Sequence, residues 1–231
     1  MNEKCEGHEQ TYRRRREQGA GGWFIEPDKF HEPIRAFFRE RHRPTRRRLL
    51  ELGCGAGEIA CWLAGEGYAV TGVDISETAL QWTRRRAEQT GVRVVVIRCD
   101  WTRAAPFEDE AFDIVLDSWC LHCIVGADRS RYLANVRRVL APGGAYLLFT
   151  GCRNERTEKS DGWDPRTSTV CAEGGPGPRC YPWPEQTLDE LRMAGFESIT
   201  HTVRDTGDGV DMLIAEARRH GAGKRTRTTR R

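Results

Sequence analysis

The sequence contains no long hydrophobic run. Nowhere in its 231 residues do about 18 apolar side chains follow one another, the length that a membrane-spanning helix requires. The polar start MNEKCEGHEQ also lacks the apolar core of a secretory signal peptide. Both absences argue against a membrane protein, and we expect a soluble protein of the cytoplasm with no membrane partner.

Cysteine is too sparse for a disulfide scaffold. The chain has nine cysteines, an odd number and a modest fraction of its length. Small secreted proteins that depend on disulfides are much richer in cysteine. We therefore expect reduced, free thiols.

Most of the chain also lacks a net basic charge. Residues 218–231 carry seven Lys or Arg and no acid, whereas the rest has 30 basic against 34 acidic residues. A basic run without apolar periodicity is typical of a solvated tail and supplies no sequence specificity toward nucleic acid. We expect a single domain over residues 1–217, a disordered tail over residues 218–231 and no nucleic-acid partner.

The central half of the chain alternates apolar runs with amphipathic stretches, an order typical of a parallel sheet covered by helices on both faces. The predicted strands are LLELG (49–53), YAVTGVD (68–74), VRVVVIRCD (92–100), FDIVLD (112–117) and AYLLFT (145–150). The predicted helices between them span residues 57–67, 76–91 with Ser76 as N-cap, and 127–144, ended by Pro142 and Gly143. This pattern predicts an α/β fold.

The flanking segments complete the prediction. Residues 152–183 are rich in Gly, Pro and charge and are expected to form a substrate-side loop or lid. A helix over 184–196 has Thr187 and Glu190 at capping-box spacing, and two strands, 197–205 and 210–219, follow it as a hairpin around the turn TGDG. Upstream, residues 28–42 predict a helix with Asp28 as a candidate cap.

The stretch ELGCGAGEIA carries the most chemical information. It places Glu51 and the glycines 53, 55 and 57 between a predicted strand and a predicted helix. Glycines at such a turn adopt positive φ and let a ligand approach the backbone, while the helix N-terminus offers free N–H groups. Gly55, Gly57 and Ala60 also satisfy the loose G-x-G-x-x-A pattern of dinucleotide-binding proteins, so a nicotinamide-dependent oxidoreductase is an alternative.

The ordered set of motifs from Leu49 to Thr150 resembles the class I S-adenosylmethionine-dependent methyltransferases. ELGCGAG is similar to the family's first motif, VTGVDIS to the second, VIRCDW to the third, FDIVLDSWCLH to the fourth and LAPGGAYLLF to the fifth strand and its preceding turn. The resemblance implies a Rossmann-like, seven-stranded, mostly parallel sheet with helices on both faces and an antiparallel C-terminal hairpin. It also implies S-adenosyl-L-methionine as cofactor and S-adenosyl-L-homocysteine as product.

The same resemblance assigns the cofactor-binding residues. Asp74 would accept hydrogen bonds from the ribose hydroxyls, Ile75 and Trp101 would pack on the adenine, and Asp100 would lie near its amino group. The full set that it implies is Glu51, Gly53, Cys54, Gly55, Gly57, Asp74, Ile75, Asp100, Trp101 and Asp117.

The stretch DSWCLHCI, Asp117 to Ile124, follows the fourth strand and should lie beside the transferred methyl group. Its Cys120, His122 and Cys123 could form a metal site or a redox dithiol, but they are too close together for an easy ligand set and lack the usual redox-helix placement. We expect no metal. His122 is the candidate catalytic base, with Asp117 beside it, and a purely pocket-lining His122 remains open.

Two further segments are candidates for the acceptor side. The N-terminal segment TYRRRREQGAGGWF, within the predicted lid 1–47, loosely resembles the segment that covers the donor in thiopurine and tellurite-resistance methyltransferases. The candidate substrate residues are Tyr12, Arg16, Trp23, Trp119, Cys152, Trp163 and Tyr181.

The acceptor class follows mainly by exclusion. The chain lacks an added RNA-binding domain and the N-P-P-Y tetrapeptide of enzymes that methylate nucleic-acid amino groups. We expect methyl transfer to an S, N or O atom of a small molecule by a monomer or homodimer. Five cysteines are expected near one pocket (120, 123, 152, 171 and 180), and they would suit a thiol, selenol or metalloid acceptor. The alternative is that they act only as small apolar residues. A further, non-enzymatic alternative is a donor-binding regulatory module or a nucleic-acid-binding protein that uses the basic tail.

Overall fold

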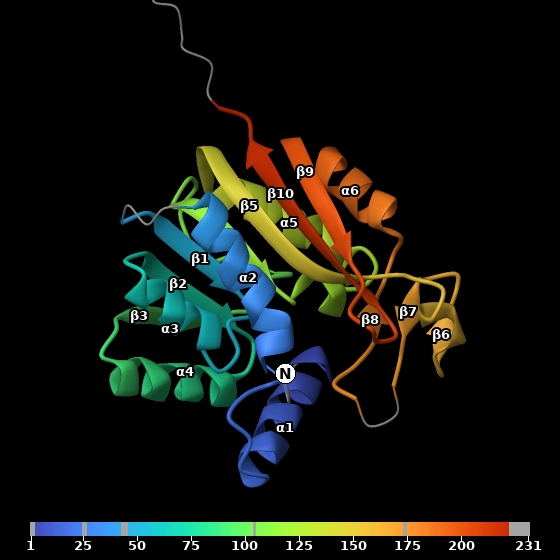
Figure 1. Ribbon diagram of the computed structural model, residues 1–231, viewed down its shortest axis with the longest axis horizontal. Coiled ribbons are helices and arrows are strands. Elements are labelled where there is room, and N and C mark those ends of the chain that lie inside the picture. The colour runs from blue at the N-terminus through green and yellow to red at the C-terminus, as the bar shows by residue number, and fades with distance from the viewer. Residues whose placement is uncertain (1–2, 25–26, 43–45, 104, 173–174, 222–231) are drawn as a thin grey trace, which may run out of the picture.

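A seven-stranded sheet forms the centre of the structure, a computed structural model that describes residues 3–24, 27–42, 46–103, 105–172 and 175–221. The strand order is β3-β2-β1-β4-β5-β10-β9 (Figure 1). The first five pair in parallel, whereas β10 runs antiparallel to both β5 and β9. The strands are β1 (Arg48–Leu52), β2 (Ala69–Asp74), β3 (Val94–Arg98), β4 (Phe112–Ser118), β5 (Leu140–Cys152), β9 (Phe196–Arg204) and β10 (Asp211–Arg219). The predicted Rossmann-like sheet with a C-terminal hairpin is confirmed.

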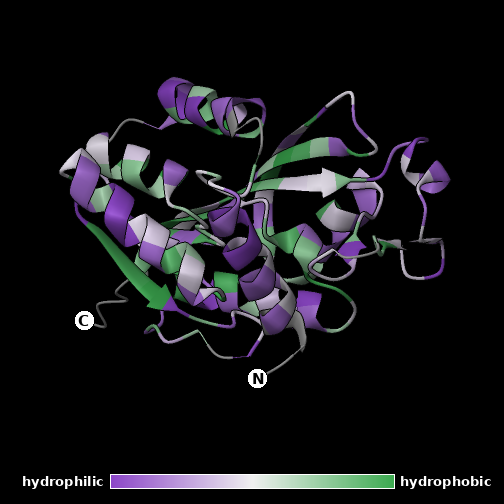
Figure 2. Cartoon of the chain, turned by 90° about the horizontal axis from the view of Figure 1, so that it is seen from below, coloured by the Kyte–Doolittle hydropathy of each residue, from purple (hydrophilic) through white to green (hydrophobic). Residues whose placement is uncertain are grey.

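Helices cover both faces of the sheet. On one face, Phe38 of α2, Ile59 of α3 and Leu80 of α4 pack on the strands; on the other, Tyr132 of α5 and Leu188 of α6 do so. Figure 1 shows α2 in front of the sheet and α5 behind it, and Figure 2 shows hydrophobic colour concentrated in the strands between helices with polar outer faces. The helices are α1 (Glu3–Glu17), α2 (Pro27–Arg41), α3 (Glu58–Gly65), α4 (Glu77–Thr90), α5 (Asp128–Val139) and α6 (Pro184–Met193).

Local signals explain the ends of some helices and not of others. Ser76 caps α4 as predicted, because its hydroxyl accepts the Ala79 N–H at 3.1 Å. Asp28 lies inside α2, which begins at Pro27, and it pairs with Arg35 instead of capping the helix. The predicted extension of α5 to residue 144 is wrong: the helix ends at Val139, and residues 141–144 form an irregularity in β5, between its Leu140 and Ala145 pairings with β4.

The predicted capping box at α6 is also wrong. The helix begins at Pro184, as predicted, but its cap is Trp183, whose N–H is accepted by the Gln186 side chain at 2.8 Å. Thr187 is fully buried within the helix, and Glu190 pairs with Arg129 of α5. Glu190, which the sequence pattern assigns to a helix cap, therefore joins α6 to α5 instead.

Residues 152–183 are not an irregular loop throughout. They contain the 3₁₀ turn η2 (Thr157–Lys159) and a small antiparallel sheet of β6 (Trp163–Asp164), β7 (Thr169–Val170) and β8 (Arg179–Cys180). Figure 1 shows this sheet beside the tip of the β9–β10 hairpin. In the described part of the chain, none of the helices combines the length and the apolar character that crossing a membrane would need. The predicted start of the tail at residue 218 is wrong, because Arg218 and Arg219 form the end of β10. Residues 222–231 of the predicted tail lie outside the described ranges.

Candidate active site

A cavity lies where the parallel strands end. Its wall is made by the segments that follow β1, β2, β3 and β4, by residues of and after α1, and by the start of β8. Figure 1 shows α1 and β8 at the same, lower end of the sheet. The side chains that bring polar or aromatic chemistry to the cavity include His8, Tyr12, Trp23, His31, Glu51, Asp74, Asp100, Trp101, Trp119, His122 and Arg179.

The glycine turn between β1 and α3 forms the floor of the cavity. Gly53, Gly55 and Gly57 have φ angles of +66°, +55° and +78°, a region that side chains other than glycine rarely adopt. A side chain would also lack room at two of these positions. A Cβ atom on Gly55 would lie 2.6 Å from the Tyr12 hydroxyl, and one on Gly53 would lie 3.1 Å from Cys120 Cβ. Both backbone conformation and close approach therefore require glycine here.

Asp74 lies at the tip of β2 with its carboxylate fixed by the backbone. One oxygen accepts the Gly55 N–H and the other the Ser76 N–H, each at 2.9 Å. Burial raises the pKa of Asp74 to about 6, although these two hydrogen bonds oppose the shift. The carboxylate is thus oriented toward the cavity with further acceptor capacity, as a ribose-binding acid requires.

Glu51 brings a second acid to the glycine turn. It is 1% exposed, and its Oε2 atom has no hydrogen-bond partner among the described residues. Burial raises the pKa of Glu51 well above its usual value, and the neighbouring Glu58 and Asp74 charges add to the shift. A buried carboxyl oxygen without a partner beside a cavity is a ready acceptor for a cationic ligand group.

The predicted adenine side is formed by the segments after β2 and β3. Ile75, Asp100 and Trp101 all line the cavity. The Asp100 carboxylate accepts the Thr102 N–H and hydroxyl at 3.1 and 2.6 Å, which fixes the turn that carries the buried Trp101 ring. An apolar wall with a carboxylate at its edge suits a flat, amino-bearing base.

Asp117 does not line the cavity. It is fully buried: one carboxylate oxygen accepts the N–H groups of Cys120 and Leu121, and the other accepts the hydroxyls of Tyr132 and Tyr146 at 2.6 and 3.0 Å. With all four contacts inside the protein, its predicted catalytic and cofactor-binding roles have no geometric basis. We revise Asp117 to a residue that fixes the turn after β4.

His122 does reach the cavity, on the 3₁₀ turn η1 (Leu121–Cys123) that follows β4. Its ring stacks on Tyr181 with 5.7 Å between centroids, and its Nδ1 atom is buried without a hydrogen-bond partner in the described ranges. Burial lowers the pKa of His122 well below 6.5, and the positive charges of Arg179 and Arg129 lower it further. The imidazole is therefore neutral near pH 7 and can accept a hydrogen bond, but these surroundings make it a weak base.

The two cysteines of the same turn are protonated thiols. Burial raises the pKa of Cys123 to about 11 and that of Cys120 well above its usual value. The Cys123 thiol donates to the Trp119 carbonyl at 3.8 Å and lies 3.6 Å from His122 Nε2. No group of three metal-ligating side chains occurs among the described residues, and all eight cysteines described are free. Neither the metal nor the redox interpretation of this stretch gains support.

Trp119 is held in a strained conformation at the wall of the cavity. Its φ angle is +65°, a region that is costly for a bulky side chain. The ring packs edge-on against Phe30 and His122, at 5.1 and 5.6 Å. Strain of this kind persists where the surrounding structure fixes it, and it often marks ligand sites.

Helix α1 closes the cavity from the N-terminal side. Tyr12 is buried over the glycine turn, and Trp23 packs on Tyr12 at 5.1 Å and on His8 at 5.7 Å. Glu9 fastens the helix to α4: its carboxylate accepts the Ser76 and Thr78 hydroxyls at 2.7 and 2.6 Å and the Thr78 N–H at 3.2 Å. Hydrogen bonds from Thr78 and Ser76 outweigh burial and lower the pKa of Glu9 to about 2.

The remaining predicted substrate residues lie outside the cavity wall. Arg16 is exposed and donates to Gln81 of α4 at 3.3 Å. Cys152 is fully buried in β5. The Arg153 guanidinium lies over the Trp163 ring, 4.7 Å from its centroid. Tyr181 stacks on His122 but does not belong to the residues that line the cavity.

Several lining residues were missed by the sequence analysis. His8 comes from a segment predicted only as part of the lid, His31 from the predicted helix before the first strand, and Glu58 opens α3 beside the glycine turn. Arg179 lies in a segment with no recognisable motif. Only Glu58 had a local signal, as the residue directly after the third glycine.

The strand order and the glycine turn at the strand tips define a Rossmann-like α/β fold, in which the cavity at the strand ends is the usual place for a nucleoside-containing cofactor. A family model described as a methyltransferase domain matches residues 50–148. This part of the chain is therefore similar to methyltransferase domains, in agreement with the sequence motifs, which resemble the class I, S-adenosylmethionine-dependent type. The looser likeness to thiopurine methyltransferases stays a prediction.

Named relatives agree with this assignment. Phthiotriol/phenolphthiotriol dimycocerosates methyltransferase 1 of Mycobacterium ulcerans is 38% identical over 130 residues, 53% of this chain and 46% of that protein. The ubiquinone biosynthesis O-methyltransferase of Paramagnetospirillum magneticum is 32% identical over 162 residues, 61% of each protein. The chain thus matches about half to three fifths of the length of these two relatives.

A solved structure supports the fold. The 1,6-didemethyltoxoflavin-N1-methyltransferase of Burkholderia thailandensis, bound to 1,6-didemethyltoxoflavin and S-adenosylhomocysteine, superposes with a TM-score of 0.64 at 23% identity. The alignment covers 83% of this chain and 78% of that one.

Proposed function

We propose that the protein transfers a methyl group from S-adenosylmethionine to a small-molecule acceptor. Asp74 would hold the ribose hydroxyls, Ile75 and Trp101 the adenine, and the glycine turn with Glu51 the methionine portion. When bound, the donor supplies a sulfonium-activated methyl group. The chain's task is to hold it in line with an acceptor atom in a cavity shielded from water.

The observation that carries this proposal is the buried Glu51 oxygen without a partner at the glycine turn. S-adenosylmethionine presents an ammonium and a sulfonium to this region, and either would compensate the buried carboxylate. A nicotinamide dinucleotide would instead place a pyrophosphate at the turn, against the carboxylates of Glu51, Glu58 and Asp74. Charge therefore favours the methyl donor over the dinucleotide.

On the acceptor side, His122 is the only predicted catalytic residue that reaches the cavity among the described residues. As a neutral imidazole with an unpartnered buried Nδ1 atom, it is suited to orient an acceptor N–H or O–H group by a hydrogen bond. The thiol, selenol or metalloid hypothesis now rests on Cys120 and Cys123, because Cys152, Cys171 and Cys180 do not line the cavity.

Calorimetric titration tests the donor assignment directly. We expect S-adenosylhomocysteine to bind to the purified chain with one-to-one stoichiometry and NADH and NADPH to show no binding. Radiolabelled S-adenosylmethionine, incubated with a panel of small phenols, amines and thiols, then tests methyl transfer itself. Tight NADPH binding without S-adenosylhomocysteine binding would show that the proposal is wrong.

A further inference from the structure

The acceptor half of the cavity contains a cationic side chain, Arg179, that forms no ion pair with a carboxylate of the described residues. Arg179 begins β8 and lines the cavity, and its guanidinium lies 6.0 Å above the Trp23 ring. Its hydrogen bond within the described ranges is a 3.5 Å contact with the Gly177 carbonyl, and no described acid forms an ion pair with it. The neighbouring arginines of this region, Arg129 and Arg153, both have carboxylate partners.

The guanidinium lies on the acceptor side rather than over the glycine turn. Strand β8, which Arg179 begins, contacts the turn η1 after β4. The charge of Arg179 adds to the lowering of the His122 pKa and opposes the raised pKa of Cys123. The acids that line the cavity lie instead at the ends of β1 and β2, at the start of α3 and directly after β3: Glu51, Asp74, Glu58 and Asp100. Positive and negative charge are thus separated between the two halves of the cavity.

Flat apolar surfaces surround this arginine. Trp23, Phe24 and Trp119 line the same cavity, and the Trp119 backbone is strained at φ +65°. Trp23 packs between Tyr12 and Arg179, so its ring has a fixed place. Rings of this kind bind an aromatic group by stacking, and a planar guanidinium binds carboxylate or phosphate oxygens in pairs.

We infer that the acceptor is an aromatic compound carrying an anionic oxygen group, a carboxylate or a phosphate, which Arg179 binds while the ring lies between the aromatic side chains. This inference rests on the proposed function, because it names the acceptor of the same site. The anion would neutralise Arg179 and leave the reacting atom of the ring to face His122 and the donor methyl group.

Binding of three simple probes tests the inference without knowledge of the natural acceptor. Benzoate, phenyl phosphate and neutral benzamide are titrated into the chain saturated with S-adenosylhomocysteine, and ligand-observed NMR reports binding. We expect at least one anion to bind and benzamide to bind much more weakly, and the tighter anion identifies the charged group. Arg179→Gln should weaken anion binding about tenfold or more, since a paired, charge-assisted contact is lost.

Matched variants separate the possible failures. Arg166→Gln changes an arginine of the same segment that is 91% exposed, and it should leave anion binding unchanged. Equal binding of benzamide, no binding of either anion, or full anion affinity in Arg179→Gln would overturn the inference. Loss of S-adenosylhomocysteine affinity in Arg179→Gln would assign the guanidinium to the donor carboxylate and also overturn it. If the wild-type chain does not bind S-adenosylhomocysteine at all, the proposed function itself fails.

Discussion

Individual acids of the cavity determine how the donor site should respond to pH. Asp74 accepts hydrogen bonds best when ionised, and burial raises its pKa to about 6. As the pH falls through this value the carboxyl takes up a proton, so affinity for S-adenosylhomocysteine should decrease by up to about tenfold per pH unit below 6 and level off above it.

Calorimetry across this pH range, with Asp74→Ala beside the wild type, measures the effect. The variant should bind about tenfold more weakly near pH 7, because a pair of charge-assisted hydrogen bonds is lost. Any pH dependence that remains in the variant belongs to Glu51 and Glu58, whose pKa values are also raised by burial. Identical pH profiles in the two proteins would contradict the ribose-binding role of Asp74.

Arg129 is a positioning residue for the turn that carries His122. Its guanidinium is 6% exposed and donates to the Leu121 and Ile124 carbonyls at 3.0 and 3.2 Å, while both Glu190 oxygens accept from it at 2.7 and 2.6 Å. Arg129→Met would leave a carboxylate and two carbonyls without their partner and should cost about 3 kcal/mol of unfolding free energy in urea.

Arg131→Met is the matched control on the same helix. That arginine is 65% exposed and pairs with Asp128 at 2.6 Å, so its loss should cost less than about 1 kcal/mol. The His122 ring signals in the NMR spectrum should shift in Arg129→Met and stay in place in Arg131→Met. Equal stability losses would show that the buried contacts of Arg129 do not fix the turn.

Among the elements, α1 is held against the cavity by one carboxylate. Glu9 accepts three hydrogen bonds from Ser76 and Thr78 at the N-terminus of α4, next to the tip of β2. Glu9→Gln weakens this attachment, so S-adenosylhomocysteine should dissociate about tenfold faster, as expected when charged hydrogen bonds are lost. Stopped-flow fluorescence, which follows the tryptophans of the cavity, measures the rate.

Glu6→Gln provides the control for this prediction. Glu6 lies on the same helix and is exposed, and it forms no ion pair with a described residue. It should leave the dissociation rate unchanged. If Glu9→Gln dissociates at the wild-type rate as well, α1 does not retain the ligand.

The elements also show why the sequence predicted some features and missed others. The strands with continuous apolar residues and the Ser76 cap follow from local pattern, and both are present. The end of α5 and the role of Glu190 depend on tertiary contacts instead: the Leu140–Gly144 segment joins β5, and Glu190 pairs with a residue 61 positions away. Helix α1 has scattered apolar residues and was therefore not predicted as a helix.

The donor site was more predictable than the acceptor site for the same reason. Glu51, Asp74 and Trp101 each occupy a fixed position relative to a strand end, so the motif placed them at the cavity. Arg179 and His8 reach it from segments that only the folded chain brings together. Gly7 of α1 shows this closeness, because a Cβ there would lie 2.6 Å from the Pro176 carbonyl oxygen.

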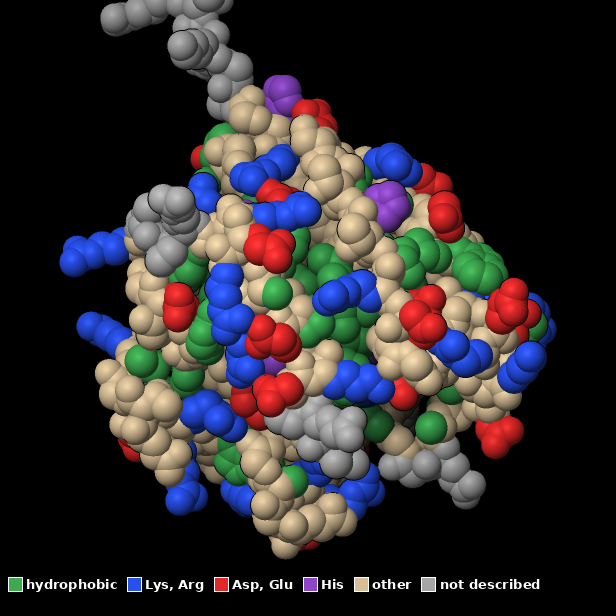
Figure 3. Space-filling view, viewed as in Figure 1, with side chains coloured by type: hydrophobic (Ala, Val, Ile, Leu, Met, Phe, Trp, Pro, Cys, Tyr) green, Lys and Arg blue, Asp and Glu red, His purple; other side chains and the backbone are tan. Residues whose placement is uncertain are grey.

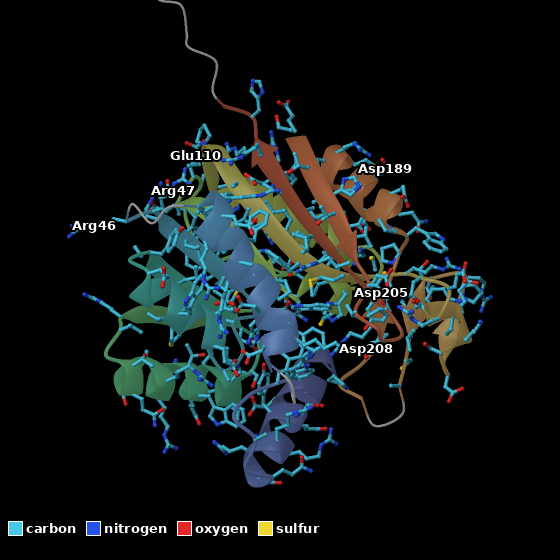
Figure 4. All side chains as sticks on the ribbon, viewed as in Figure 1. Arg46, Arg47, Glu110, Asp189, Asp205 and Asp208 are labelled. Carbon is cyan, nitrogen blue, oxygen red and sulfur yellow. The ribbon has the colours of Figure 1, made fainter. Side chains whose placement is uncertain are left out.

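Across the whole molecule, ion pairs join segments that are distant in sequence. Asp208 in the β9–β10 turn pairs with Lys29 of α2 at 2.6 Å, and Arg156 pairs with both Asp205 and Asp211. Figure 4 shows Asp205 and Asp208 at the small-sheet end of the hairpin, whereas Arg46, Arg47 and Glu110 lie at the opposite side of the molecule. These exposed pairs contribute little stability each, but they connect α2 and the segment after β5 to the same turn.

The surface charge of the molecule bears on its partners. On the face shown in Figure 3, basic and acidic side chains are interspersed without a large area of one sign. Residues 222–231 hold five basic residues and no acid, so their removal changes the formal net charge from +3 to −2. Any affinity for nucleic acid should therefore depend on this tail and fall steeply with salt.

Deletion of residues 222–231 separates the enzyme hypothesis from the nucleic-acid alternative. All seven strands and the residues that line the cavity precede this segment, so affinity for S-adenosylhomocysteine and the melting temperature should equal those of the full chain. Electrophoretic mobility shift with a random DNA duplex at low salt should show weak binding for the full chain and none for the deletion. A deletion that loses donor affinity, or one that keeps tight DNA binding at physiological salt, would assign the function to a part of the molecule other than the cavity.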